Sequence, residues 1–278
     1  MNIYKSTGLF LFAYALPTLI IGFVWVIPAS CIEGINEFTI GFVGAVFGSL
    51  PIYLAVTRPK QCSVRPNSNS LLKCLNEYIN LHASHPRGLL GYILGWLWRF
   101  QSDSINDAAL DLLDLKPGDH VLEVGCGSGL TIKKILNQVS ESRVTGLDVS
   151  PLMIEMATRT NRCSLTRNRL RLAVTQGEVP DDLPLFDKIL SVHSIYFWQE
   201  PENMLFKLSN QLRPGGKIVI VAKVKDQGIP ARYDDSTYRF YKEVEITDML
   251  KDNGLKIDVK KEPDAHPGIR WFVGQKPV

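Results

Sequence analysis

The chain lacks any arrangement of cysteines that would suggest a metal site or a disulfide framework. It has five cysteines among 278 residues, and no two of them have the short spacing of a metal-binding pair. They are Cys31, Cys62, Cys74, Cys126 and Cys163. We therefore expect no bound metal, and reduced cysteines are typical of a cytoplasmic domain.

The chain also lacks a strong net charge. Its formal charge is +3 at pH 7, and no stripe of basic residues alternates with aromatic residues. A nucleic-acid partner is therefore not expected. The chain has no internal repeat, and its length suits one α/β domain of ordinary size with further segments before it.

Charged residues are absent from two long stretches near the start of the chain. The first has 27 residues, from Ser6 to Ile32, and the second has 20, from Phe38 to Thr57. A helix of about 20 apolar residues crosses the hydrocarbon core of a bilayer. We predict a membrane anchor in residues 1–57, with transmembrane helices at about 7–28 and 38–57. The lipid bilayer is then one partner of the chain.

The charges that flank these stretches predict their orientation. Lys5 precedes the first stretch, the short connector is acidic, and cations that begin with Arg58 follow the second. Since positive charge stays on the cytoplasmic side, we predict a multi-pass membrane protein with its domain in the cytoplasm. A cleaved signal peptide is the main alternative, although the first stretch exceeds the usual length of its apolar region. Residues 58–69, rich in proline, asparagine and serine, are predicted to form a linker.

The most informative motif is VLEVGCGSG, from Val121 to Gly129. Its apolar residues predict a buried parallel strand, and its three glycines predict a tight turn into a helix that begins near Ser128. Glycine permits a positive φ and lets a ligand approach the backbone closely. A dinucleotide fingerprint would need a glycine where this chain has Leu130. Nicotinamide chemistry is therefore disfavoured.

This GxGxG pattern resembles the first motif of class I S-adenosylmethionine-dependent methyltransferases, because Glu123 precedes it and Asp148 closes the next predicted strand, RVTGLD. A carboxylate in the place of Asp148 can hold two ribose hydroxyls. Taken alone, it can also cap the helix predicted to follow at Ser150 and Pro151. The resemblance implies S-adenosylmethionine as the cofactor and methyl transfer as the reaction.

The resemblance also implies a set of cofactor-binding residues. An acid of the family accepts a hydrogen bond from the adenine amino group, and Glu178 holds that place after the predicted strand LRLAV. His193 follows the fourth predicted strand, where relatives have residues beside the transferring methyl group. The full set is Glu123, Gly125, Cys126, Gly127, Gly129, Asp148, Val149, Gly177, Glu178 and His193.

Strand and helix signals alternate from Asp119 to about Ala222, which predicts an α/β fold with a mostly parallel sheet and helices on both faces. In the segment QLRPGG, Pro214 predicts the end of a helix, and the glycines predict a turn into the next strand. A helix is predicted near Glu243 to Asp252, before two more strands. The resemblance implies a Rossmann-like sheet of seven strands with the last pair antiparallel, over residues 113–278.

Residues 70–112 are predicted to form an N-terminal helical lid. The stretch HPRGLLGYILGWLW, from His85 to Trp98, is similar to a subgroup of methyltransferases related to quinone biosynthesis. In that subgroup the segment before the first strand covers the cofactor. The same apolar stretch also suits the interface of a membrane, and both interpretations are kept.

The predicted catalytic residues are His193 and Tyr196, in the segment HSIYFW. Methyl transfer from a sulfonium needs alignment and exclusion of water, but no obligatory base. If the acceptor is a hydroxyl or an acidic carbon, His193 is the best-placed base; it can also be a structural imidazole or part of the pocket wall. Tyr196 and Trp198 suit packing against an acceptor, whereas His266 is expected to be structural.

The sequence therefore predicts a membrane-anchored methyltransferase that acts at the cytoplasmic face on a small-molecule acceptor, either a lipid or a quinone-like compound. Tethering raises the effective concentration of an acceptor dissolved in the membrane. The alternative is a non-catalytic membrane protein that binds S-adenosylmethionine as a sensor or assembly partner. Nothing in the sequence specifies the acceptor atom or the oligomeric state.

Overall fold

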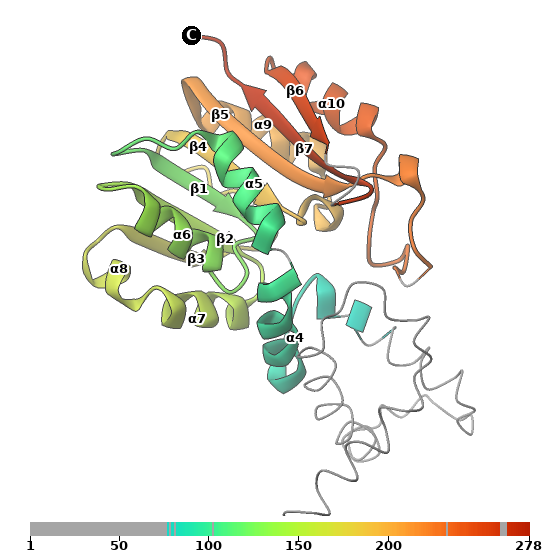
Figure 1. Cartoon of the computed structure of the whole chain (residues 1–278), viewed down its shortest axis with the longest axis horizontal. Coiled ribbons are helices and arrows are strands. Elements are labelled where there is room, and N and C mark those ends of the chain that lie inside the picture. Colours follow the sequence, from blue (N-terminus) through green and yellow to red (C-terminus); the bar gives the residue numbers. More distant parts are fainter. Residues whose placement is uncertain (1–76, 78, 81, 102, 232, 262–265) are drawn as a thin grey trace, which may run out of the picture. The chain divides into compact units, whose positions relative to one another are not determined.

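The computed structural model describes residues 77–278 of the chain, apart from positions 78, 81, 102, 232 and 262–265 (Figure 1). Residues 67–278 belong to one compact unit. The anchor predicted in residues 1–57 and the linker predicted at 58–69 lie outside the described residues. Within the described part, no helix is both long enough and apolar enough to cross a membrane.

A seven-stranded sheet forms the centre of this unit, in the order β3-β2-β1-β4-β5-β7-β6. The first five strands of that order pair in parallel, whereas β7 pairs antiparallel with both β5 and β6. The predicted Rossmann-like sheet with an antiparallel last pair is confirmed. The strands are β1 His120–Val124, β2 Arg143–Asp148, β3 Leu170–Val174, β4 Phe186–Val192, β5 Leu212–Lys223, β6 Lys256–Lys261 and β7 Ile269–Gln275.

Helices cover both faces of the sheet. Helices α9 and α10 pack on one face, and α5 and α6 pack on the other, joined there by α7 and α8. The helices with their bounds are α4 Gly88–Gln101, α5 Asp103–Leu113, α6 Leu130–Gln138, α7 Pro151–Thr160, α8 Arg162–Thr166, α9 Pro201–Gln211 and α10 Glu243–Asp252. Two short 3-10 helices, η2 Ile195–Phe197 and η3 Lys225–Gln227, follow β4 and β5.

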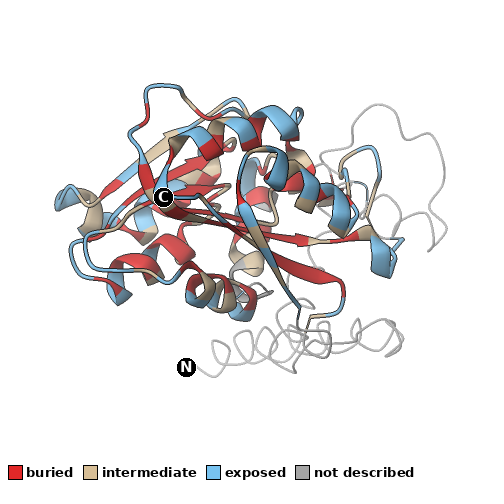
Figure 2. Cartoon of the chain, turned by 90° about the horizontal axis from the view of Figure 1, so that it is seen from above, coloured by how far each residue is buried: buried red, intermediate tan, exposed pale blue. Residues whose placement is uncertain are grey.

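Alternating side chains of the central strands divide the core into two layers. In β5, Ile218 and Ile220 pack toward α9 and α10, whereas Val219 and Val221 pack toward α5 and α6. All four side chains are fully buried. Figure 2 shows these buried strands between helices whose outer sides are exposed. Because both faces are covered, the segment 218–222 of β5 is apolar throughout and gives no alternating pattern in the sequence.

The helix after the glycine turn begins at Leu130, two residues later than predicted. Gly127 and Gly129 have φ values of +50° and +73°, in the left-handed region. Residues in that conformation cannot belong to a right-handed helix. The turn is therefore longer than the sequence pattern suggested.

Strand β5 also differs from the expectation of a turn after α9. It begins at Leu212, which pairs with Phe186, and regular pairing resumes only where Lys217 pairs with Lys188. The residues RPGG between these two pairs form an irregularity in the strand, with Gly215 at φ +74°. A bulge accommodates Pro214, which cannot donate a hydrogen bond to the sheet.

Helix α5, which the sequence placed in the lid segment, belongs to the core of the domain. Ala109 and Leu113 are fully buried. The indole Nε1 of Trp271 in β7 donates a hydrogen bond to the Ile105 carbonyl at 3.2 Å. The layer that covers the sheet therefore starts at α5.

Helix α4 packs on α7 instead of the sheet. A Cβ added to Gly91 would lie 3.1 Å from a methyl carbon of Leu152, and one added to Gly95 would lie 2.6 Å from Cε of Met153. Residues four apart share one face of a helix, so the two glycines allow close approach of α7. The Ser150 hydroxyl donates to the Pro86 carbonyl at 2.7 Å, which fixes the start of α4 beside the end of β2.

Candidate active site

The three glycines of the turn after β1 have different surroundings. A Cβ on Gly125 would lie 2.7 Å from Cβ of Ser194, and one on Gly129 would lie 2.8 Å from Cβ of Ala157. A Cβ on Gly127 would meet nothing within 4 Å. Gly125 and Gly129 are therefore required by packing within the protein, whereas Gly127 borders open space. This is where a ligand can approach the backbone.

Asp148, at the end of β2, binds the same turn. Its Oδ2 accepts a hydrogen bond from the Gly127 N–H at 2.8 Å, and its Oδ1 accepts one from the Ser150 N–H at 2.9 Å. Burial raises the pKa of this carboxyl, and the backbone hydrogen bonds oppose that shift. Each oxygen keeps a lone pair for another donor. The predicted ribose acid therefore lies next to the open side of Gly127.

Glu123 lies beneath the turn and is almost fully buried. Burial raises the pKa of its carboxyl to about 8, although a hydrogen bond with Thr131 acts in the opposite direction and the charge of Asp148 adds to the rise. Within the described part of the chain, its Oε2 has no hydrogen-bond partner. An unpaired buried oxygen of this kind favours a ligand that supplies a donor.

Cys126 and Val149 are neighbours in sequence of the glycine turn and of Asp148. The Cys126 side chain is buried in the core beside α6, and burial raises the pKa of its thiol. Only its backbone belongs to the turn, where its N–H donates to the Leu147 carbonyl at 3.0 Å. Val149 directly follows Asp148 and is half-buried.

The loop after β3 carries Gly177 and Glu178. Gly177 has φ +86° and open space where a Cβ would be. The Glu178 side chain is 78% exposed and lies 3.8 Å from Nζ of Lys207 in α9. The loop and α9 line a small groove, to which Asn203 and Lys207 also contribute. Sequence reasoning missed these two α9 residues, because they resemble any polar residues on a helix surface.

His193 directly follows β4, as predicted, and its backbone is left-handed with φ +54°. Its N–H donates to the Val221 carbonyl of β5 at 2.9 Å. Its Nδ1 lies 3.0 Å from the Tyr196 hydroxyl. Burial lowers the pKa of this imidazole to about 4, assisted by the nearby charges of Lys223 and His266. The ring is therefore neutral at physiological pH.

Tyr196 lies behind His193 and is almost completely buried. Its hydroxyl accepts a hydrogen bond from the backbone N–H of Lys223. Its ring packs against Phe240, with ring centroids 4.9 Å apart. Trp198, which we expected to contact an acceptor, is buried in the core below α9 and is only 6% exposed.

The loop between β5 and α10 supplies more of this aromatic cluster. Tyr233 and Tyr238 pack in a T-shaped arrangement with centroids 5.1 Å apart, and Tyr238 stacks on Phe240 at 5.6 Å. The Arg239 N–H donates to the Tyr196 carbonyl at 3.0 Å. These contacts tie the loop to η2 and hence to the segment that follows His193.

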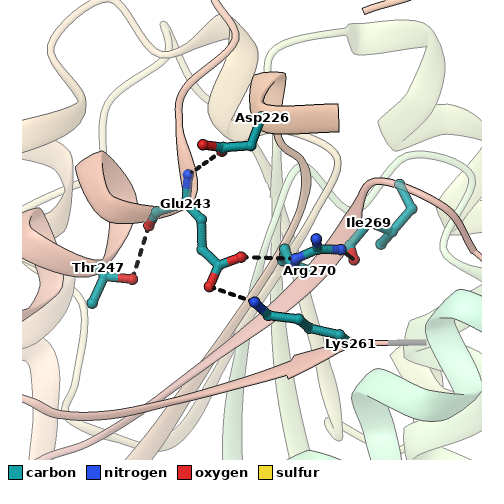
Figure 3. A network of polar contacts seen from close by, with 6 residues as sticks. All are labelled: Asp226, Glu243, Thr247, Lys261, Ile269 and Arg270. Atoms are coloured by element: carbon teal, nitrogen blue, oxygen red, sulfur yellow. Dashed lines mark hydrogen bonds and ion pairs between the residues drawn. The ribbon is translucent and has the colours of Figure 1, made fainter. Parts of the chain in front are cut away.

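A charged network fixes the end of this loop at the start of α10 (Figure 3). The Glu243 carboxylate accepts from Nε of Arg270 at 2.9 Å and pairs with Nζ of Lys261 at 3.0 Å. The Glu243 N–H donates to Oδ2 of Asp226 at 2.7 Å. The two cations lower the pKa of Glu243 despite some desolvation. Strands β6 and β7 are thereby joined to the loop that carries the aromatic residues.

The charges of two basic residues, which the sequence did not connect with His193, contribute to its lowered pKa after the larger effect of burial. Lys223 ends β5, and its ammonium donates to the Pro267 carbonyl at 3.2 Å. His266, expected to be structural, lies near enough for its charge to affect His193. Its Nε2 is 3.1 Å from the Ser104 hydroxyl of α5. No local sequence pattern predicts that these residues affect His193, because they come from separate segments of the chain.

Residues 122–218 match a protein family described as a methyltransferase domain. The fold is similar to phosphoethanolamine N-methyltransferase 2 of Haemonchus contortus in complex with S-adenosyl-L-methionine, with a TM-score of 0.54 and 17% identity. That similarity covers 63% of this chain and 53% of the other. Residues 122–218 therefore match a methyltransferase domain, on a fold that is shared with S-adenosylmethionine-dependent methyltransferases. S-adenosylmethionine is the cofactor of such domains.

Two relatives of this chain have names that include a quinone or hydroquinone. Demethylmenaquinone methyltransferase of Tropheryma whipplei (strain Twist) is 31% identical over 134 residues, which are 48% of this chain and 52% of the relative. The chloroplastic 2-methyl-6-phytyl-1,4-hydroquinone methyltransferase 2 of Oryza sativa subsp. japonica is 29% identical over 199 residues, 64% of this chain and 54% of the relative. The chain spans about half the length of these relatives.

The residues of the turn fit S-adenosylmethionine. The open space over Gly127 would be filled by any Cβ, so it is kept free by the glycine. Asp148 has acceptor capacity left for hydroxyl groups, and Oε2 of Glu123 has no partner in the described part of the chain. Acceptors of this kind suit a cofactor that carries ribose hydroxyls and an ammonium group.

Proposed function

We propose that this methyltransferase transfers a methyl group from S-adenosylmethionine to an apolar small molecule, a lipid or quinone-like compound, at the cytoplasmic face of a membrane. One observation carries the proposal: the segment of His193 contacts the glycine turn. The Ser194 hydroxyl donates to the Val124 carbonyl at 3.2 Å. The open side of Gly127 and the predicted acceptor residues thus lie at one edge of the sheet, where ligands bind in folds of this type.

Several features support an apolar, ring-containing acceptor. The part of the edge formed by η2 and the loop before α10 is rich in aromatic side chains. Aromatic side chains pack well against flat apolar rings. The names of the two relatives refer to a menaquinone precursor and a phytyl hydroquinone, and an acceptor of the same class agrees with this composition.

The membrane location is supported by two observations of different kinds. The uncharged stretches in residues 1–57 have the length of membrane spans. In the described part of the chain, α4 presents exposed Leu89 and Tyr92 on a helix without charges from Gly88 to Trp98. An apolar helix of this kind suits the interfacial region of a bilayer. Since α4 also packs on α7 beside Asp148, the cofactor edge would lie near the membrane.

The chain's own residues supply binding, orientation and exclusion of water. When bound, S-adenosylmethionine supplies an electrophilic methyl group on a sulfonium. Asp148 and Gly127 hold the cofactor, and Glu178 is placed to accept from its adenine. His193 contacts the acceptor, and the buried Tyr196 holds His193 in place. Alignment of the reacting atoms and exclusion of water are the contributions that these residues make to the rate.

The test is transfer of a labelled methyl group from S-adenosylmethionine to a total membrane extract. The full chain is compared with a version that lacks residues 1–57, which leaves the compact unit of residues 67–278 intact. We expect label in the lipid fraction, and much less of it without the first 57 residues. Label in water-soluble compounds only would refute the lipid acceptor but not methyl transfer.

Absence of label in every fraction, with S-adenosylmethionine binding retained, would refute the catalytic proposal. The alternative of a sensor or assembly partner would then hold. His193→Ala separates the two cases further, because it should reduce methyl transfer while cofactor binding remains. A variant that binds and transfers as well as the unchanged chain would remove His193 from the acceptor site.

A further inference from the structure

We propose that Tyr196 is a positioning residue that fixes His193 in its Nε2–H tautomer, so that His193 meets the acceptor as a hydrogen-bond donor and not as a base. The inference rests on the proposed function, since it assigns the role of His193 within the same site. It departs from the sequence analysis, in which His193 was the best-placed general base.

The direction of the hydrogen bonds leads to this tautomer. The Lys223 N–H can only donate, so the Tyr196 oxygen is the acceptor of that bond. The Tyr196 hydroxyl then has its own proton to donate, and Nδ1 of His193 lies 3.0 Å away. A neutral imidazole has one N–H and one acceptor nitrogen. With Nδ1 as the acceptor, the proton is on Nε2.

The opposite tautomer would leave a polar group unsatisfied. If Nδ1 carried the proton, the Tyr196 oxygen would accept two hydrogen bonds and its own proton would need a third partner. Tyr196 is only 6% exposed, and aromatic rings surround it. An unsatisfied buried donor is destabilising, because it loses its hydrogen bond to water without gaining another. The Nε2–H form is therefore the stable one.

The ring of His193 is also fixed in orientation. Its backbone has φ +54° and is bonded to Val221 of β5. Strained backbone of this kind persists where the surrounding structure determines it. The Tyr196 ring lies nearly parallel to the imidazole, at 6.0 Å between centroids and 23° between planes. The Tyr196 ring is in turn held by its packing against Phe240, with ring centroids 4.9 Å apart.

The charges that face His193 act in the same direction. Lys223 at the end of β5 and His266 before β7 both disfavour the imidazolium, and burial disfavours it more. Tyr233 and Tyr238 lie beside Tyr196 and disfavour its ionised form, after the larger effect of burial. Both members of the pair are therefore neutral near pH 7. A neutral N–H of His193 can donate a hydrogen bond to the methyl acceptor, if that molecule has a carbonyl or hydroxyl oxygen beside the methylated atom.

The first test reads the tautomer directly by NMR of the full chain labelled with 15N-histidine. The chain has only five histidines, so the signals of His193 are identified by their loss in His193→Gln. We expect a protonated Nε2 and an unprotonated Nδ1 in the unchanged chain. In Tyr196→Phe we expect a mixture of tautomers and a higher pKa of His193. Protonated Nδ1 in the unchanged chain, or an unaltered tautomer in Tyr196→Phe, would overturn the proposal.

The matched control is Tyr241→Phe. Tyr241 is also buried in the same loop region, but its hydroxyl has no hydrogen-bond partner within the described residues. The substitution removes the same atom without removing a bond to His193. It should leave the His193 tautomer unchanged. A similar change in both variants would indicate a general loosening of the loop and refute the positioning role.

The second test uses the kinetics of methyl transfer. His193→Gln keeps an N–H donor but cannot act as a base, so we expect it to retain activity within about tenfold, whereas His193→Ala should lose about 100-fold. Tyr196→Phe should lower kcat by about three- to tenfold and introduce a pH dependence above pH 5. Equal loss in His193→Gln and His193→Ala would show that an N–H donor at this position does not sustain the reaction, and would overturn the proposal. If no variant transfers methyl groups, the proposed function fails, and the NMR test still decides the tautomer.

Discussion

The two halves of the sheet's carboxyl edge are built in different ways. At β1 and β2, backbone groups make the site: the Gly127 N–H binds Asp148, and glycines allow close contacts that no other residue permits. At β4 and β5, side chains make it, since His193 depends on Tyr196, which depends on Phe240 and on the loop before α10.

This difference explains which half of the sheet's carboxyl edge tolerates amino-acid substitution. A turn that depends on backbone geometry restricts positions such as Gly125 and Gly129 to glycine, because a Cβ there would clash. A site built from packed aromatic side chains changes shape with each substitution while the fold remains. We therefore expect changes near β1 and β2 to affect cofactor binding, and changes near β4 and β5 to affect the acceptor.

The largest effect is expected for Gly127→Val. Valine resists the left-handed backbone at this position, and its side chain would fill the open space. The dissociation constant of S-adenosylmethionine should rise at least about 100-fold, equivalent to about 2.7 kcal/mol, in isothermal titration calorimetry. The control is Gly118→Val, because Gly118 has φ +84° and equally open surroundings but precedes β1 at the opposite edge. Equal loss in the control would attribute the effect to backbone strain.

Asp148→Asn should weaken cofactor binding by about 10- to 100-fold. The substitution keeps the size of the side chain but removes charge-assisted hydrogen bonds, each worth about 1.5–3 kcal/mol. The same calorimetric titration measures the change. Asp187→Asn is the control, since Asp187 also accepts a backbone N–H, from His120, but at the start of β4. Unchanged affinity in Asp148→Asn would eliminate the assignment of Asp148 to the ribose.

Glu123 should make the stability of the cofactor-free protein depend on pH. Its folded-state pKa of about 8 lies above the ordinary value of 4.5, so the folded state binds the extra proton between these values. The free energy of unfolding therefore falls as pH rises through this window. Between pH 5 and 8 the free energy of unfolding should fall by about 1–3 kcal/mol less in Glu123→Gln than in the unchanged chain. Urea unfolding measures this difference. Identical slopes in both proteins would contradict the raised pKa.

The smallest effect is expected for Phe240→Leu, in the half built from side chains. Leucine fills most of the volume of the ring but loses the aromatic contact with Tyr196. The KM for the acceptor should rise about two- to fivefold, and the KM for S-adenosylmethionine should stay the same, in steady-state methyl-transfer assays. A larger change in the KM for the cofactor would mean that the two halves of the edge are not independent.

The strands could be predicted closely because each lies between clear turn signals. RVTGLD and LRLAV match β2 and β3 residue for residue. The helix start at Leu130 was missed because the sequence shows which residues are glycine but not which adopt positive φ. The core position of α5 was missed because an amphipathic helix before the first strand can cover either a ligand or a sheet.

The sequence alone predicted the glycine turn and the acid beside it, which form the proposed cofactor side. Fixed spacings of Gly125, Gly127, Gly129 and Asp148 follow from local backbone geometry, which depends on neighbouring residues in the chain. Only the tertiary structure decided the other side, where the Tyr196 hydroxyl accepts from the Lys223 N–H and lies 3.0 Å from Nδ1 of His193. It also turned Tyr196 from a surface for the acceptor into the support of His193. These contacts join residues that are far apart in the chain. They depend on long-range packing, which no spacing between residues in the sequence indicates.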